Sequence, residues 1–277
     1  MIVSSKELLQ KAKEQHFAIP SANFVDQLSA RAHIEVAEEM NLPLILSFAQ
    51  SHSAYQSLEE AAALGKYYAK KAKVPVVLHL DHGEDFDFIK RAIDLGFTSV
   101  MIDASSKSLD ENIRITKEVV DLAHGNNICV EAEIGHVGTG ISVDKFDEAQ
   151  SIYTSVDEAV SLTEKTGLDS LAVSIGTAHG SYKGMPVINF ERLKELSENV
   201  PVPLVLHGGS SSGDENLEKC ALGGIAKINI YTDFILGAYN NLKEHEAKNY
   251  YDTKNVLKEG MKDILRRYYK VFHTQSI

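Results

Sequence analysis

The chain has 277 residues, of which 44% are hydrophobic and 24% charged, and its formal net charge is −11. This composition is typical of a soluble globular protein, and the acidic balance argues against nucleic acid or an anionic membrane as a partner. A small anion remains compatible if helix N-termini, backbone amides, a metal or a lysine hold it locally. Cys129 and Cys220 show no metal-binding spacing, and we find no signal peptide and no run of membrane-spanning length. These features together predict a cytoplasmic protein.

In chain order, the sequence predicts a regular alternation of strands and helices. An amphipathic helix over residues 4–15 comes first and is able to cap the floor of a barrel. Apolar runs then predict eight strands, at residues 18–24, 42–48, 74–81, 99–103, 129–135, 170–176, 203–209 and 226–231. Helical periodicity between them predicts helices at residues 27–40, 58–71, 86–95, 109–123, 156–166, 190–198 and 214–222.

Residues 229–233 end the eighth strand and open a further helix, and a long amphipathic helix is expected at residues 253–272. Alternation of this kind predicts an α/β fold with a parallel sheet, and eight repeats favour a closed barrel over a doubly wound sheet. We therefore expect one (β/α)8 TIM barrel domain over residues 1–277, with an extra N-terminal helix and a C-terminal helical extension.

Three histidines follow directly after three of the apolar runs, namely His82, His179 and His207. The carboxyl ends of barrel strands converge on one mouth, so these imidazoles are expected to lie close together. Three such ligands can hold one metal and leave a coordination position open, as in a catalytic zinc site. His79, by strand alternation, is instead expected inside the barrel with a hydrogen-bond partner.

Carboxylates are predicted around the same mouth. Asp81 precedes His82, where it would act as a general acid or base or support a metal ligand. Asp103 ends the fourth strand, and Glu131 and Glu133 alternate along the fifth. These groups could take an alternative metal position or orient ligands, but Asp103 could equally cap the next turn, and Glu131 could be a salt-bridged barrel residue.

Glycine-rich turns follow the last strands. Residues 208–213 read Gly-Gly-Ser-Ser-Ser-Gly after the seventh strand, and residues 229–233 end the eighth. In barrels these two loops often form a phosphate cradle from backbone amides and a helix N-terminus. Residues 180–183 would add further amides and the ammonium group of Lys183.

Five segments together resemble the class II, zinc-dependent ketose-bisphosphate aldolases. They read L-H-L-D-H-G at residues 78–83, S-V-M-I-D at 99–103, G-T-A-H-G at 176–180, L-H-G-G-S at 206–210 and K-I-N-I-Y-T-D at 227–233. The resemblance runs from residue 18 to the final helix, and several independent motifs occur in the family's order. The family is therefore identified with high specificity, and it implies the same barrel fold, usually in dimers or tetramers.

The resemblance implies reversible cleavage of a ketose 1,6-bisphosphate, most simply fructose 1,6-bisphosphate, to dihydroxyacetone phosphate and an aldehyde phosphate in carbohydrate metabolism such as glycolysis. Zn²⁺ is the implied cofactor, accompanied in some members by a monovalent cation, and it would stabilise the enediolate as a Lewis acid. No Schiff-base lysine is required. Lys227 is the only lysine within a predicted strand, and its place at the start of that strand predicts a position far from the mouth.

The resemblance also implies roles for individual residues. His82, His179 and His207 correspond to the zinc ligands, and Asp81 to the acid/base at the bond that breaks. Asp103 and Glu133 correspond to groups near a second or alternative metal position. The implied substrate-binding residues are Asn23, Gly180, Lys183, Gly208, Gly209, Ser210, Asn229 and Thr232.

The long polar stretch at residues 135–153 is a predicted lid over the mouth. The family carries a proton-shuttling glutamate in this loop, and this chain has Ile141 at the matching position. Asp144, Asp147 and His136 are the other groups in the loop that could carry a proton.

Two further departures concern the substrate's far half. Tyr231 stands where fructose-bisphosphate aldolases usually have an aspartate, and Ala49 stands where a serine is common, with Ser47 and Ser51 nearby. Tagatose 1,6-bisphosphate or another phosphorylated ketose is therefore an alternative substrate. A metal-dependent hydrolase is disfavoured because no strand end carries a lysine for a carbamylated bridge. A non-catalytic relative that binds a sugar phosphate has Ile141 as its only support.

Overall fold

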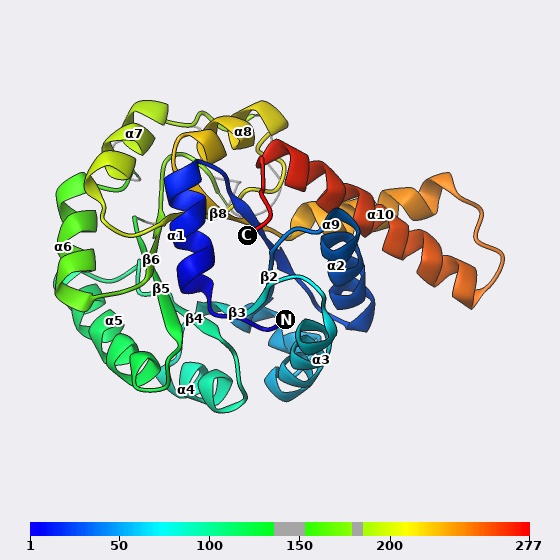
Figure 1. Cartoon of the computed structure of the whole chain (residues 1–277), viewed down its shortest axis with the longest axis horizontal. Coiled ribbons are helices and arrows are strands. Elements are labelled where there is room, and N and C mark those ends of the chain that lie inside the picture. Colours follow the sequence, from blue (N-terminus) through cyan, green and yellow to red (C-terminus); the bar gives the residue numbers. More distant parts are fainter. Residues whose placement is uncertain (136–152, 179–184) are drawn as a thin grey trace.

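The computed structural model describes residues 1–135, 153–178 and 185–277. Eight parallel strands close into a barrel in chain order, with β1 paired to both β2 and β8 (Figure 1). The predicted (β/α)8 fold is confirmed. The strands are β1 (Ile19–Asn23), β2 (Leu44–Ala49), β3 (Val76–Gly83), β4 (Ser99–Ile102), β5 (Cys129–Ile134), β6 (Ser170–Val173), β7 (Leu204–Leu206) and β8 (Ile225–Ile230).

Helices surround the barrel, and a short 3-10 helix, η1 (Gln50–Ala54), follows β2. Among the helices in the described part of the chain, none is long and apolar enough to cross a membrane. The helices are α1 (Ser5–Gln15), α2 (Gln27–Met40), α3 (Leu58–Lys71), α4 (Phe86–Asp94), α5 (Leu109–His124), α6 (Val156–Thr166), α7 (Phe190–Asn199), α8 (Asp214–Leu222), α9 (Thr232–Glu244) and α10 (Tyr250–Val271).

Two strands fall furthest short of their predicted lengths. The strands expected at residues 170–176 and 203–209 form ladders of only four and three residues, in β6 and β7. Both predictions included the glycines of the following turn, and Gly176 and Gly208 adopt positive φ values of 117° and 67°. This backbone conformation is incompatible with a continuing strand. His207 therefore stands at the first position after β7.

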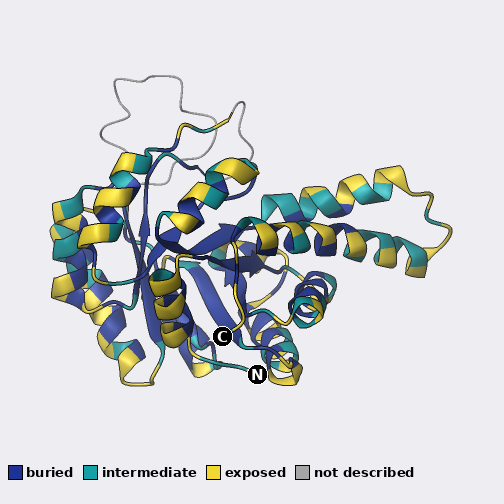
Figure 2. Cartoon of the chain, turned by 45° about the horizontal axis from the view of Figure 1, so that its top comes forward, coloured by how far each residue is buried: buried dark blue, intermediate teal, exposed yellow. Residues whose placement is uncertain are grey.

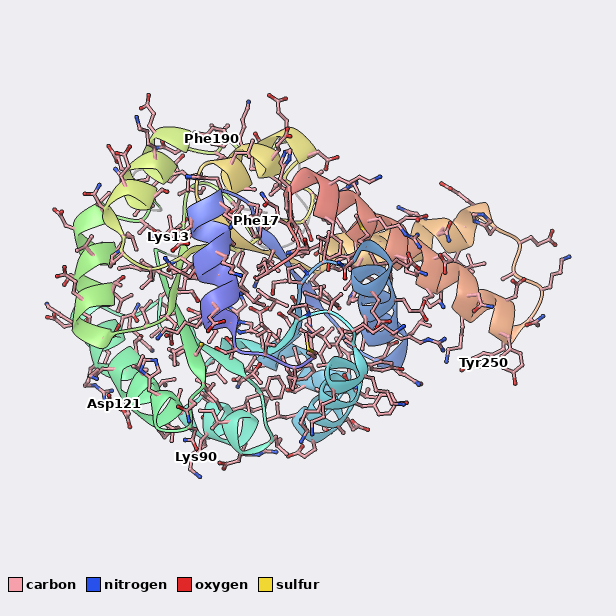
Figure 3. All side chains as sticks on the ribbon, in the orientation of Figure 1. Lys13, Phe17, Lys90, Asp121, Phe190 and Tyr250 are labelled. Atoms are coloured by element: carbon pink, nitrogen blue, oxygen red, sulfur yellow. The ribbon has the colours of Figure 1, made fainter. Side chains whose placement is uncertain are left out.

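The N-terminal helix α1 closes the floor of the barrel, as the sequence predicts (Figure 3). Its Leu8 and Leu9 join Phe17 and residues from the starts of four strands in one buried apolar cluster. The ammonium of Lys13 donates to the carbonyls of Val200 and Pro201, each at 2.8 Å, and so ties α1 to the turn before β7. The floor is apolar, which leaves the opposite end of the barrel for polar groups.

The C-terminal helices form an arm. α9 packs against α10, and the two helices extend away from the barrel, while α10 also packs against α2 (Figure 2). Arg266 and Lys262 of α10 contact Glu39 of α2 at 2.7 and 2.6 Å. The helical extension predicted at residues 253–272 is thus α10, which begins three residues earlier at Tyr250, where Asn249 caps it.

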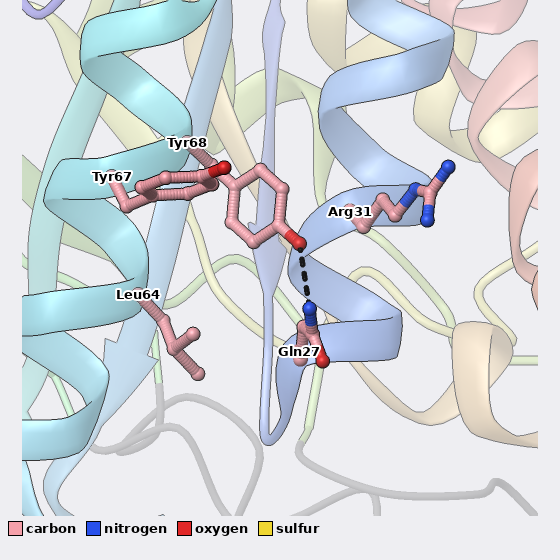
Figure 4. Close-up of a pocket in the computed structure, with 5 residues that line it drawn as sticks. All are labelled: Gln27, Arg31, Leu64, Tyr67 and Tyr68. Atoms are coloured by element: carbon pink, nitrogen blue, oxygen red, sulfur yellow. Dashed lines mark hydrogen bonds between the residues drawn. The ribbon is translucent and has the colours of Figure 1, made fainter.

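A pocket in the outer helix layer lies between α2 and α3 (Figure 4). The side-chain amide of Gln27 donates to the Tyr68 hydroxyl at 3.3 Å across it. Its lining residues are Gln27, Arg31, Leu64, Tyr67 and Tyr68. None of the candidate site residues lines this pocket.

One close backbone approach fixes the turn after β7 against the segment after β6. A Cβ atom on Gly208 would lie 2.3 Å from the carbonyl oxygen of Ala178, and Gly208 has a positive φ. Gly167, at the end of α6, also has a positive φ of 73°, but no atom lies within 4 Å of the position that a Cβ on this residue would take. Any substitution would therefore strain the backbone at both glycines, but only at Gly208 would the new side chain also clash with a neighbouring atom.

This contrast yields a stability prediction. Gly167→Ala should lower the free energy of unfolding by about 1 kcal/mol, the cost of a left-handed non-glycine residue. Gly208→Ala should lower it by about 2–4 kcal/mol, because the steric clash with Ala178 adds to that strain. Urea unfolding of the two variants measures the difference. Equal losses of unfolding free energy would show that the close approach of Gly208 to Ala178 adds no cost to the substitution.

Candidate active site

A local irregularity in β3 brings two neighbouring side chains to the mouth. Consecutive residues of a regular strand point to opposite faces, but His82 adopts φ 45°, and the pairing of β3 with β4 shifts register between Leu80 and Gly83. Asp81 is buried at 4% exposure, and the ring nitrogen Nδ1 of His82 lies 3.0 Å from Oδ2 of Asp103. Asp81 and His82 can therefore serve one site.

Asp103 contacts a predicted metal ligand and also caps a turn. Its Oδ2 contacts His82, while its Oδ1 accepts hydrogen bonds from the amide and hydroxyl of Ser105 at 3.1 and 2.7 Å. Burial would raise the pKa of Asp103, but the bonds to His82 and Ser105 hold it well below its usual range. The ionised carboxylate thus caps the turn after β4 and faces the mouth.

The predicted metal ligands within the described residues converge. The ligand atoms of Asp81, His82 and His207 lie within 4.8 Å of one another, and so do those of His82, Asp103 and Glu133. The rings of His82 and His207 have centroids 4.5 Å apart. Imidazole nitrogens and carboxylate oxygens suit Zn²⁺, so this donor set fits the predicted metal. His179 lies outside the described residues.

Two asparagines hold the carboxylate of Asp81. The side-chain amides of Asn23 and Asn229 donate to Oδ2 and Oδ1 respectively, each at 2.8 Å. Burial would raise the pKa of Asp81, but the nearby charges of His82, His207 and Lys227 hold it well below its usual range. Asn23 and Asn229 were predicted to bind substrate. Their amides orient Asp81, and Oδ1 of Asn229 has no hydrogen-bond partner among the described residues.

A buried ion pair supports His207 from below. The ammonium of Lys227 donates to both carboxylate oxygens of Glu131, at 2.9 and 2.8 Å, and all three side chains of this group are at most 1% exposed. Oε1 of Glu131 lies 3.0 Å from Nε2 of His207, and Oε2 of Glu133 lies 3.0 Å from its Nδ1. The imidazole of His207 is thereby fixed on both sides.

The network corrects the expected position of Lys227. Its place near the start of β8 predicted a side chain far from the mouth, yet one carboxylate separates its ammonium from His207. The long lysine side chain reaches along the barrel interior, which strand position alone does not reveal. Glu131 is the salt-bridged barrel residue that the sequence offered as one interpretation.

His79 occupies the layer beneath the mouth, as predicted. Its Nδ1 lies 2.8 Å from the hydroxyl of Ser99, and its Nε2 lies 3.4 Å from the Lys227 ammonium. Burial and the charge of Lys227 lower the pKa of His79 to about 3, so its ring is neutral. In a neutral ring whose Nε2 accepts a hydrogen bond from Lys227, Nδ1 carries the proton and donates to the Ser99 hydroxyl oxygen.

The turns after β7 and β8 interlock at the predicted phosphate cradle. The Ser210 hydroxyl oxygen accepts hydrogen bonds from the amides of Tyr231 and Asp233, at 3.2 and 3.3 Å, which leaves its O–H free to donate elsewhere. The Gly209 amide donates to the carbonyl of Asn229 at 3.2 Å and is therefore engaged within the protein. Thr232 opens α9 at the same place.

Several predicted residues lie outside the described part of the chain. Gly180 and Lys183 of the cradle are among them, as is most of the lid predicted at residues 135–153. The other lid residues discussed above, which also lie there, are His136, Ile141, Asp144 and Asp147.

The arrangement can be compared with known proteins. A family model described as class-II fructose-bisphosphate aldolase matches residues 3–276. The chain belongs to the class II fructose-bisphosphate aldolase family. The YdjI aldolase from Escherichia coli K12 is 35% identical, with a TM-score of 0.89 over 99% of this chain and 98% of that one. Fructose-bisphosphate aldolase (Fba) from Campylobacter jejuni is 26% identical, with a TM-score of 0.86 over 99% and 96%.

Sequence reasoning missed two contributors to the site of this aldolase. Lys227 was set aside, although a lysine inside an apolar strand requires a buried acidic partner and Glu131 was available in β5. His52 was not among the predicted site residues, yet it follows β2 by three residues and is only 8% exposed. Its position just after a strand was the signal that could have identified it.

The ion pair yields a prediction that separates stability from ligand positioning. Lys227→Met should lower the free energy of unfolding by about 3–5 kcal/mol, because the charge of Glu131 stays buried without its main partner. Adding Glu131→Leu should recover most of that loss. The double variant should still bind Zn²⁺ about 10–100-fold more weakly, since His207 has lost the carboxylate that orients it.

Urea unfolding and a competition assay with a chelating dye measure the two effects. Lys219→Met is the control, because its ion pair with Glu215 is exposed and its loss should be undetectable by either method. Full metal affinity in the double variant would show that Glu131 does not position His207.

The pKa of His207 predicts how metal binding depends on pH. Burial would lower this pKa, but the hydrogen bonds and charges of Glu131 and Glu133 raise it to about 10. The imidazole of the metal-free protein is therefore protonated at neutral pH, and a metal must displace that proton. Zn²⁺ affinity should rise with pH between about 6 and about 8, by up to about tenfold per unit for each proton displaced.

Calorimetry in buffers of different ionisation enthalpy counts the protons released. A Zn²⁺ affinity independent of pH, with no proton release, would exclude His207 as a ligand that is protonated in the metal-free protein.

Proposed function

We propose that this chain is a zinc-dependent aldehyde-lyase that reversibly cleaves a phosphorylated ketose to dihydroxyacetone phosphate and an aldehyde. The observation that carries the proposal is the Asp81 carboxylate, buried and held by two amides directly beside the cluster of His82 and His207. A metal-ligand cluster beside an oriented carboxylate is what cleavage next to a carbonyl requires. Fructose 1,6-bisphosphate is the simplest substrate of this class.

In the proposed reaction, Asp81 takes the proton from the hydroxyl on the carbon that becomes the aldehyde, and the adjacent carbon–carbon bond breaks. The lowered pKa of Asp81 keeps the carboxylate ionised in the metal-free protein, which is the form that can accept a proton. In condensation the same group returns the proton. His82, His179 and His207 would hold the zinc, with Asp103 and Glu133 at an alternative position. When bound, Zn²⁺ supplies a Lewis acid for the negative charge that develops on the three-carbon fragment.

The phosphate of dihydroxyacetone phosphate is assigned to the turns after β7 and β8. The Ser210 O–H and the start of α9 at Thr232 offer donors there, and Gly208 and Lys183 complete the proposed cradle. A helix N-terminus favours an anion through its unpaired amides and its dipole. The net charge of −11 makes such local donors necessary.

A second substrate candidate has its own observation. Ala49 and Tyr231 stand at the mouth in place of the polar and acidic residues usual in fructose-bisphosphate aldolases, and Ala49 pairs in register with Asp81. Tagatose 1,6-bisphosphate or another phosphorylated ketose is the alternative.

We also propose that the chain forms one barrel domain and assembles as a homodimer or homotetramer. The exposed side chains of Leu236 and Tyr239 in the arm would contribute to that interface. A cytoplasmic location is consistent with the two free cysteines.

The test combines a panel of ketose phosphates with solvent exchange of the dihydroxyacetone phosphate proton, followed by NMR in D₂O. EDTA should abolish both activities and Zn²⁺ should restore them. Asp81→Ala should retain bound zinc and lose cleavage by about 10²–10⁴-fold, the range expected for a general acid/base. Cleavage that survives metal removal, or an Asp81→Ala enzyme that turns over normally per bound zinc, would contradict the proposal.

A further inference from the structure

Two aromatic side chains from different loops stack across one side of the mouth. His52 lies in η1, which packs against the end of β3 as well as β2, and Tyr231 follows β8 directly. Their ring centroids are 4.3 Å apart with an interplanar angle of 41°. Because β8 and β2 both flank β1 in the barrel, this stack bridges the end of β1, where Asn23 holds Asp81.

The stack includes a buried polar atom that pairs with no described residue. His52 is only 8% exposed, and its Nδ1 has no hydrogen-bond partner among the described residues. Oδ1 of Asn229, whose amide holds Asp81, is likewise buried without a partner among them. Buried side-chain polar atoms are nearly always paired. Two such atoms, on residues that bind Asp81 or lie within its electrostatic influence, therefore point to a ligand with hydroxyl groups.

The metal-ligand cluster and the proposed phosphate cradle occupy the other sides of the mouth. The metal-ligand cluster comes from β3, β4, β5 and β7, and the interlocked turns after β7 and β8 form the proposed phosphate cradle. The sector over β1 and β2 remains for the substrate carbons that lie beyond Asp81. His52 and Tyr231 are the aromatic wall of that sector.

The charges around the wall disfavour a second phosphate. The ionisable groups that act on the two rings are Asp81 and His82 at His52, and Tyr55 and Asp26 at Tyr231, with no lysine or arginine among them in the described part of the chain. Burial lowers the pKa of His52 and keeps the ring neutral at pH 7. The two carboxylates would repel a phosphate dianion, and the one cation in this group, His82, is a proposed metal ligand. A neutral imidazole and a phenol can instead hydrogen-bond to hydroxyls.

We propose that His52 and Tyr231 form the binding wall for the aldehyde half of the substrate, and that this half is an uncharged, hydroxylated chain. This inference rests on the proposed function and selects, within its substrates, ketose 1-phosphates that end without a second phosphate. Both side chains act on binding and not on bond cleavage, so they determine specificity.

Condensation with dihydroxyacetone phosphate tests the wall with two aldehydes, D-glyceraldehyde and D-glyceraldehyde 3-phosphate. The zinc-loaded wild-type enzyme should have a kcat/KM at least about tenfold higher for D-glyceraldehyde. Tyr231→Phe and His52→Phe keep an aromatic ring and remove a hydrogen-bonding atom. Each should lower kcat/KM for D-glyceraldehyde by about tenfold, mainly through KM, because one neutral hydrogen bond to substrate is lost.

Tyr67→Phe is the matched control, since Tyr67 lies in the outer pocket between α2 and α3 (Figure 4). Loss of its hydroxyl should leave kcat/KM unchanged for both aldehydes. Preference of the wild type for D-glyceraldehyde 3-phosphate, or equal effects of the two wall variants on both aldehydes, would overturn the inference. Solvent exchange of the dihydroxyacetone phosphate proton needs the metal, the phosphate cradle and a group that accepts the proton, but no aldehyde. Exchange by the wild type alongside either overturning result would defeat the wall alone. A zinc-loaded wild type that neither condenses either aldehyde nor catalyses exchange would defeat the proposed function itself.

Discussion

The buried ion pair of Lys227 and Glu131 is the interaction on which the rest of the candidate site depends. Two charges at 1% exposure carry a large desolvation cost, which only close contact and further hydrogen bonds offset. Lys227 donates hydrogen bonds to both oxygens of Glu131, and Oε1 of Glu131 also contacts Nε2 of His207. Apolar replacements would fill the same volume without orienting an imidazole. We infer that the pair persists because it fixes His207 and not because it maximises stability.

The polar groups of the barrel interior become more numerous from floor to mouth. Ile19, Ile45 and Val77 pack on α1 at the floor. Lys227, which is in register with Ile19, extends into a middle layer with Glu131 and His79. Side chains from alternate strand positions fill a barrel in layers, so each successive inward position of a strand lies one layer nearer the mouth. The metal-ligand cluster therefore stands on a rigid, fully paired layer, and the charges that lower the pKa of Asp81 come partly from it.

The sequence predicts the parts of this molecule that depend on local patterns. Apolar runs and helical periodicity were sufficient for the barrel, the floor helix and the histidines at strand ends. Contacts across the barrel were less accessible, because strand order and register decide which side chain reaches which. The sequence placed Asn23 and Asn229 at the mouth, but it did not predict that both would donate hydrogen bonds to Asp81. The break in alternation at His82 depends on one left-handed residue that no periodicity encodes.

The two halves of the mouth are built from different kinds of structure, and this difference explains how one barrel can serve several ketoses. Asp81, His207 and their partners sit on or next to strands and belong to a network in which each change leaves a buried polar group unpaired. His52 and Tyr231 belong to connecting segments, whose backbone tolerates substitution. Changing the wall alters which aldehyde is bound while the metal-ligand cluster keeps its geometry. A departure at Tyr231, which lies in a connecting segment beside the strand-borne cluster, is what such a division predicts.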